Sequence, residues 1–337
     1  NDFIQGISMR FGICAVIGAV LADNGGFQNA TKALAAVTGD AGWQGAYTAF
    51  LGPDPLALLF VVILTSLGTW GLPQMVQKFY AITDEGAIHK GTVISTVFAL
   101  VVAGGCYFLG GFGRVFADRI DIAANGYDSI VPTMLENLSP SLIALAVILV
   151  LAASMSTLSS LVLASSSTMA IDFINGCVMK DKMNVRQQLL TIRLLVVVFI
   201  IISAAIALAQ YNSKVTFIAQ LMGISWGALA GSFLAPFLYS LYWKRTTKAA
   251  CWVCFASGTL VMVADMVPAT RAMLPAIMQS PINCGVIAML AGLVIVPVVS
   301  IFTRAPEKAE VDRIFSCYDR KVVVSVKTAI ENCEAAK

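Results

Sequence analysis

The residues best suited to chemistry in this sequence are hydroxyl side chains inside a long apolar run. Five of them fall between Ala152 and Ser160. Ala153, Ser156 and Thr157 are spaced i, i+3 and i+4, which places them on one face of a helix. Two hydroxyl oxygens and the carbonyls of that turn could then point at one spot. A monovalent cation such as sodium needs several oxygens of this kind in place of its hydration shell.

A structural interpretation of the same run stays open. Ala152, Ser156, Ser160 and Ala164 recur every four residues. Such a stripe of small residues lets two membrane helices approach closely. Packing and cation binding are compatible, because positions 153 and 157 lie beside this stripe.

A second irregularity interrupts an uncharged run at residues 55–77. Gly68, Gly71 and Pro73 fall within it, and Pro73 lacks a backbone donor. The spacing therefore predicts a broken or kinked helix. Broken spans form solute sites in secondary transporters, because their irregular backbone is tolerated only where it faces protein or a wet cavity. A proline kink without any ligand is the alternative.

The composition predicts a membrane environment for these features. Apolar residues make up 58% of the 337, the mean hydropathy is +0.83, and charged residues are only 12%. A soluble domain of this size cannot bury so much apolar surface, so the lipid bilayer is the expected partner. The net charge of +3 gives no reason to expect nucleic acid.

Long stretches without charge place the spans. Six uncharged stretches of at least 20 residues occur, and two weaker apolar stretches contain Arg10 or Asp265. No run alternates as the strands of a membrane barrel do, so we expect an all-α polytopic membrane helix bundle with a core at 1–303 and a cytoplasmic tail at 304–337. The eight expected helices are about 7–22, 56–77, 91–112, 141–167, 189–209, 215–241, 249–267 and 284–302.

The basic residues predict the orientation. With eight spans both ends lie on one side, which receives 17 of the 22 Lys and Arg residues and leaves 5 for the other. Lys and Arg favour the cytoplasmic side. We therefore expect a multi-pass protein of the plasma membrane, with both ends of the chain on the cytoplasmic side.

No constellation typical of an enzyme is present. The single histidine is His89, and the sequence shows no serine triad, histidine metal cluster or phosphate loop. We expect no enzyme activity and no cofactor. A proton-coupled carrier or channel, for which Asp265 is the one acidic residue inside a predicted span, and a transporter-like sensor module remain alternatives.

Four passages resemble the sodium/solute symporter family, which includes proline, pantothenate and sugar transporters. The first, at 2–6, has the pattern Asp-x-x-Gln, and the second, at 71–79, has Gly-x-Pro followed by Lys78-Phe79. The third, at 152–167, has Ala-x-x-Ser-Thr, and the fourth, at 241–245, reads Leu-Tyr-Trp-Lys-Arg. Each is weak alone, but their order and separation are fairly specific and cover most of the chain.

The resemblance implies a leucine-transporter-like architecture of two inverted five-helix repeats. The chain starts at Asn1 and enters the apolar pattern almost at once. By the resemblance, the first repeat is mostly missing, so we expect a longer protein with about five further helices, one of which completes both sites.

The resemblance also implies roles for individual residues. Ala153 would supply a carbonyl, and Ser156 and Thr157 hydroxyls, to one sodium ion, while Asp2 would lie near the sodium exit. An N-cap is the alternative for Asp2. The residues of the broken helix that would bind the solute are Trp70, Gly71, Pro73 and Gln74.

The function implied is sodium-coupled symport of a small organic solute by alternating access, with sodium as the coupling ion. Proline-transporting relatives carry Trp and Tyr where this chain has Thr65 and Thr69. The resemblance therefore does not imply proline as the solute.

Overall fold

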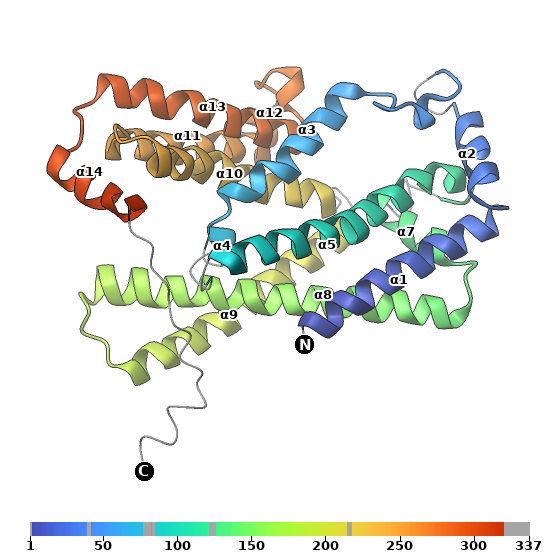
Figure 1. Cartoon of the computed structure of the whole chain (residues 1–337), viewed down its shortest axis with the longest axis horizontal. Helices are drawn as coiled ribbons and strands as arrows, with labels where there is room; N and C mark the ends of the chain where they lie inside the picture. The colour runs from blue at the N-terminus through green and yellow to red at the C-terminus, as the bar shows by residue number, and fades with distance from the viewer. Residues whose placement is uncertain are drawn as a thin grey trace, which may run out of the picture. The chain divides into compact units, whose positions relative to one another are not determined.

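Helices make up all the regular structure in the part of the chain that the computed structural model describes (Figure 1), namely residues 2–38, 42–76, 82, 85–120, 126–213 and 218–319. Seven helices there are long and apolar enough to cross a membrane. The prediction of an all-α polytopic membrane bundle is confirmed.

The seven candidate spans correspond to seven of the eight expected helices. They are Gln5–Asp23, Gly86–Ala117, Pro140–Val178, Val185–Tyr211, Gln220–Tyr242, Lys248–Met266 and Pro281–Phe302. The eighth expected helix, 56–77, is divided into three short helices: α3 (Pro55–Ser66), η3 (Gly68–Gly71) and α4 (Pro73–Val76).

Two compact units make up the chain, and each is described by itself. The first comprises residues 1–53 and 96–217, and the second comprises 54–95 and 218–337. One of the three boundaries between them, at residues 95 and 96, falls within α5 (Glu85–Gly111).

The first unit is built around α1 (Asp2–Asp23), α8 (Pro140–Ser167), α9 (Val185–Ser213) and the later part of α5. Shorter helices complete it. They are α2 (Phe27–Ala36), η2 (Ala46–Thr48), η5 (Phe112–Arg119), η6 (Tyr127–Ser129), α7 (Ile130–Leu135) and the π-helix η7 (Thr168–Val178).

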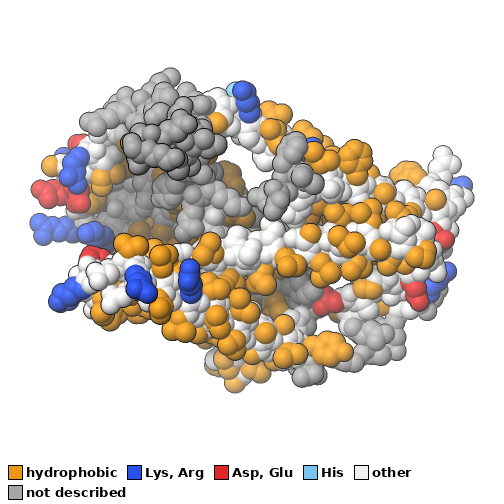
Figure 2. Space-filling view, turned by 90° about the horizontal axis from the view of Figure 1, so that it is seen from below, with side chains coloured by type: hydrophobic (Ala, Val, Ile, Leu, Met, Phe, Trp, Pro, Cys, Tyr) orange, Lys and Arg blue, Asp and Glu red, His pale blue; other side chains and the backbone are white. Residues whose placement is uncertain are grey.

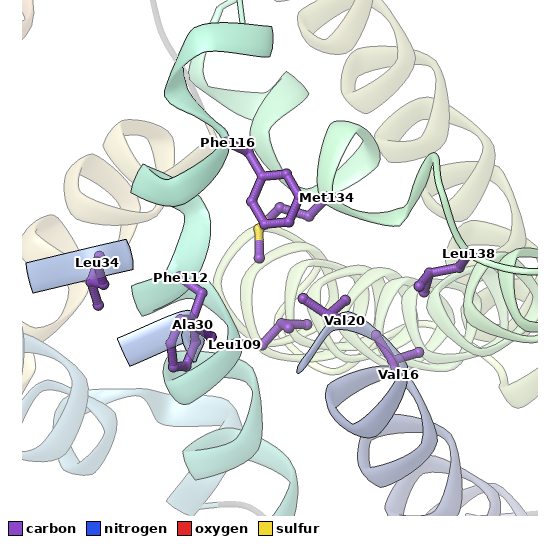
Figure 3. Close-up of a cluster of buried hydrophobic side chains, with 9 residues drawn as sticks. All are labelled: Val16, Val20, Ala30, Leu34, Leu109, Phe112, Phe116, Met134 and Leu138. Carbon is purple, nitrogen blue, oxygen red and sulfur yellow. The ribbon is translucent and has the colours of Figure 1, made fainter. Parts of the chain in front are cut away.

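One hydrophobic cluster joins five of these helices and the turn after α7 (Figure 3). Phe112 and Phe116 of η5 contribute its aromatic rings. Because these side chains come from segments far apart in the sequence, burying them fixes how the helices meet. The nine buried side chains are Val16, Val20, Ala30, Leu34, Leu109, Phe112, Phe116, Met134 and Leu138.

A tight joint connects α8 to α9 through η7. Asn175 is buried there, donates from Nδ2 to Asp181 Oδ1 (3.1 Å), and accepts at Oδ1 from the backbone of Met183 (3.1 Å). Lys180 and Asp181 have positive φ angles of 50° and 58°, which non-glycine residues adopt at a cost. The bonds from Asn175 hold this strained turn closed.

The second unit is built on α10 (Ile218–Tyr242), α11 (Lys248–Met266) and α13 (Pro281–Phe302), which pack on one another. The remaining elements after α11 are short. They are α12 (Pro268–Arg271), η8 (Ala276–Met278), α14 (Lys308–Phe315) and η9 (Ser316–Asp319).

Glycines allow the three long helices of this unit to touch through their backbones. A Cβ added to Gly227 would lie 2.6 Å from the Cα of Gly285, and one added to Gly258 would lie 2.6 Å from the carbonyl carbon of Gly231. Lipid tails offer no hydrophobic driving force between helices, so such close contacts stabilise their association.

Large apolar side chains remain exposed on the outer faces of the helices. Leu100, Leu151 and Ile201 are more than half exposed, and hydrophobic side chains cover much of the face shown in Figure 2. A surface of this kind suits contact with lipid.

Candidate functional site

The helices α1 and α8 pack against each other in opposite directions (Figure 1). Gly12 of α1 contacts Leu149 of α8. Further along α1, Val20 belongs to the same cluster as Leu142, which lies earlier on α8. Residue numbers therefore rise on one helix as they fall on the other.

This packing defines what lies opposite the hydroxyl cluster. Ser156 follows Leu149 by seven residues, which is two helical turns, about 10 Å, on the same face. Seven residues back from Gly12 along α1 is Gln5. Helical spacing therefore places Ser156 on the same side of α8 as Leu149, which contacts α1, while the Ser156 side chain itself is exposed.

Only some of the oxygens in the hydroxyl cluster take part in hydrogen bonds. Ser159 Oγ donates to the Ser156 carbonyl and Ser160 Oγ to the Thr157 carbonyl, both at 2.9 Å. Among the residues that the structure describes, no hydrogen bond engages the hydroxyls of Ser156 and Thr157. Both side chains are exposed, and Ala153 is half-buried. Two neighbouring hydroxyls thus remain available as ligands.

Asp2 is the first residue of α1, three positions before Gln5. Its side chain lies outside the described part of the structure. The helical spacing puts positions 2 and 5 on one face.

The small-residue stripe is mostly uncovered within this unit. Ala152, Ser156 and Ser160 are exposed, and Ala164 is half-buried. The close helix contact that the stripe would permit does not involve these positions in the described residues.

The broken segment is a short 3-10 turn between two helices. Asp54 caps α3 by accepting from Leu56 N (3.1 Å) and Ala57 N (3.0 Å), so the helix starts firmly. It ends at Ser66, and Leu72 has the extended backbone (φ −85°, ψ 116°) expected of a residue before proline. The break expected from the sequence is present.

Long-range packing determines how the broken segment lies. Gly71 and Leu72 are buried. A Cβ at Gly71 would lie 2.9 Å from the Cα of Ala230 and 2.9 Å from the Cβ of Leu234, both on α10. The backbone of the break therefore lies directly against α10, which only glycine permits.

The four expected solute-binding residues are placed differently from one another. Trp70 is 60% exposed, Pro73 and Gln74 are half-buried, and Gly71 is buried against α10. Lys78 and Phe79, which belong to the same motif, lie outside the described residues.

A cavity of about 520 Å³ opens beside the break, within the second unit. Of the four expected residues it includes Trp70 alone. Half of its lining comes from the last turns of α10, which the sequence did not assign to a site. The lining residues are Thr69, Trp70, Met75, Val76, Phe237, Leu238, Leu241 and Tyr242.

The two features lie in different units. The cluster of Ala153, Ser156 and Thr157 belongs to the first unit, and the broken segment with its cavity belongs to the second. No group of three His, Cys, Asp or Glu residues that could hold a metal ion occurs in the described ranges.

Comparison with known proteins identifies the family. The model of the sodium:solute symporter family matches residues 1–258, so the chain belongs to this family and is a multi-pass membrane protein. The resemblance noted in the sequence is confirmed.

Curated relatives are transporters. The sodium/pantothenate symporter of Escherichia coli (strain K12) is 26% identical over 265 residues, 78% of this chain and 53% of the relative. The high-affinity proline transporter PutP of Bacillus subtilis (strain 168) is 26% identical over 315 residues, which cover 93% of this chain and 62% of the relative. A sodium/proline symporter of Staphylococcus aureus (strain JH9) is 29% identical over 213 residues, which cover 62% of this chain and 41% of the relative. The chain thus spans about half the length of the relatives it matches.

Proposed function

We propose that the full-length protein is a sodium-coupled symporter of a small organic solute. The observation that carries the proposal is the pair of hydroxyls on Ser156 and Thr157, which make no hydrogen bond among the described residues and belong to a helix that packs on α1. Membership of the sodium:solute symporter family supports it.

Sodium would bind to neutral oxygens. In this proposal Ala153 contributes its carbonyl, and Ser156 and Thr157 their hydroxyls. Neutral ligands bind a monovalent ion without the cost of burying several carboxylates in the membrane. Asp2, at the start of α1, would attract the ion as it leaves toward the cytoplasm.

The solute would bind at the broken segment, with Trp70, Gly71, Pro73 and Gln74. The relatives named above transport pantothenate and proline, and solutes of that size are the first candidates. Threonine at positions 65 and 69, where proline transporters have aromatic residues, argues for a solute other than proline.

Alternating access would couple the two fluxes. Sodium entering a negative interior gains about 2.3 kcal/mol per 100 mV, in addition to its concentration gradient. If sodium and solute favour the same conformation, each raises the affinity for the other by an equal factor. The leucine-transporter-like architecture and cytoplasmic ends belong to this proposal.

The test is solute uptake into vesicles that contain the purified full-length protein. Labelled pantothenate, proline, sugars and carboxylates are offered with an inward sodium gradient, with potassium in place of sodium, and with a pH gradient alone. We expect uptake of one solute class only with sodium. An interior-negative potential of 100 mV should raise accumulation up to about fifty-fold per sodium ion. Uptake that ignores sodium and follows the pH gradient would refute sodium coupling.

Proton coupling is the second candidate, because α11 carries a buried carboxylate. The side chain of Asp265 is 1% exposed, and no hydrogen bond to either of its oxygens occurs in the described structure. Its ion-pair partner is Arg271, with Nε 3.6 Å from Oδ1. Arg271 also donates to the carbonyl of Gln279, so this pair ties the loop after α11 to the helix.

Asp265→Asn separates the two candidates. A proton carrier would lose its coupling, because Asn cannot take up a proton at neutral pH. A sodium symporter would keep its sodium dependence in this variant and would change only in stability. The measurement is the sodium and pH dependence of uptake in the same vesicles.

A further inference from the structure

Among the residues that the structure describes, the lining of the cavity beside the broken segment includes no charged side chain. Four of its lining residues come from 69–76 and four from 237–242. All eight belong to the second unit, so the cavity is formed within one compact body. A charged group placed there would lose its hydration without gaining a counter-charge.

Aromatic rings and a few polar atoms shape this cavity. Trp70 and Tyr242 are 60% and 75% exposed, and Phe237 is half-buried. The hydroxyl of Thr69 donates to the carbonyl of Ser66 (2.8 Å). That donor is therefore used within the break, so the indole N–H of Trp70 and the phenol of Tyr242 are the side-chain donors left in the described lining.

Small-molecule sites in proteins have this character. They are mostly apolar, with a few polar groups that set orientation, and typically enclose about 300–1,000 Å³. Aromatic side chains such as Trp and Tyr offer large apolar faces together with one polar atom each.

We infer that this cavity holds the uncharged, apolar part of the transported solute, and that Phe237 and Tyr242 of α10 select solutes by that part. The inference rests on the proposed function and narrows it. A solute that carries a charge keeps it away from this cavity, and a solute with an apolar or ring-shaped portion gains affinity from contact with Trp70.

The test uses the fluorescence of Trp70 as a direct probe. In the full-length protein every other tryptophan is replaced by phenylalanine. Bromine atoms quench indole fluorescence on contact, so uncharged 2,2,2-tribromoethanol is titrated beside its anionic counterpart tribromoacetate. We expect saturable quenching by the alcohol and no saturable quenching by the anion.

Two controls come from the chain itself. A protein with Trp252 as its sole tryptophan, 72% exposed on α11 and outside the cavity, should show only linear quenching by tribromoethanol. In the Trp70 protein, Leu238→Phe narrows the cavity and should raise the half-saturating concentration about tenfold. Leu260→Phe, at an exposed position outside the cavity, should leave it unchanged.

The transported solute completes the test. Added at saturating concentration, it should displace tribromoethanol and so restore Trp70 fluorescence. Linear quenching of Trp70, equal quenching by the anion, or a transported solute that displaces nothing would each overturn the inference while the proposed function stands. Absence of sodium-driven uptake would refute the proposed function, whatever the quenching shows.

Discussion

Ser156 and Thr157 carry no charge, so an ion that they bind is held by oxygen dipoles alone. Their neighbours Ser159 and Ser160 bond back to the carbonyls of the same turn. These bonds engage the carbonyls of Ser156 and Thr157, and no hydrogen bond engages the hydroxyls of the same two residues in the described structure. The sodium proposal therefore depends on side-chain oxygens at positions 156 and 157.

Ser156→Ala combined with Thr157→Ala should raise the sodium concentration for half-maximal uptake about tenfold or more. The reason is that an oxygen that interacts directly with a charged group contributes about 1.5–3 kcal/mol to its binding. The measurement is uptake against sodium concentration in vesicles. Ser203→Ala, at an exposed serine of α9, is the control. An unchanged sodium dependence would leave only a packing role for the two hydroxyls.

Among the elements, the broken segment depends on its contact with α10. Pro73 ends the hydrogen-bond pattern locally, and the absence of a side chain at Gly71 lets the backbone reach Ala230 and Leu234. The break is thus kept in place by a helix about 160 positions later in the sequence.

Gly71→Ala should destabilise the full-length protein by about 1–3 kcal/mol, because the added methyl overpacks the contact with α10. Thermal unfolding in detergent measures it. Gly91→Ala, on α5 with open space around the position, should instead gain up to about 1 kcal/mol from helix propensity. Equal effects of the two substitutions would contradict the close contact.

The joint between α8 and α9 depends on the pairing of Asn175 with Asp181. Asn175 supplies a donor and an acceptor to the turn that contains two left-handed residues. The amide of Asn175 supplies both the donor for Asp181 and the acceptor for the Met183 backbone.

Asn175→Asp should cost about 1–3 kcal/mol of stability, because it brings two carboxylates together in place of a hydrogen bond. Adding Asp181→Asn to this variant should recover most of the loss, since the amide introduced at position 181 then donates to the carboxylate at position 175. Thermal unfolding of the two single variants and the double variant gives the coupling between the positions. Additive effects would show that the bond does not hold the joint.

The whole molecule presents apolar helices to its surroundings, as a multi-pass membrane protein does. The spans are long enough to cross, and the uneven distribution of Lys and Arg predicts their orientation. Orientation is a property of the sum over all loops rather than of any one residue.

In a cysteine-free full-length protein, Trp43→Cys should react with a membrane-impermeant maleimide added to intact cells. Lys182→Cys should react only after the membrane is permeabilised, because its loop faces the cytoplasm in the proposed orientation. Both positions are exposed. The reverse pattern of labelling would invert the topology.

The sequence alone was enough to identify the spans, the break and the hydroxyl cluster. Each depends on neighbours in the chain: twenty apolar residues form a span whatever follows them, and Pro73 interrupts hydrogen bonding wherever the helix lies. The Ser156 and Thr157 spacing likewise shares a face by helical geometry alone.

Tertiary structure decided which of these local features meet other parts of the chain. The packing of α1 on α8, the burial of Gly71 against α10 and the contribution of Phe237 and Tyr242 to a cavity join segments far apart in the sequence. In an apolar span every face has a similar hydrophobic pattern, so periodicity does not show which face packs on a neighbour. That choice follows from the shapes of the packed side chains, which only the folded chain brings together.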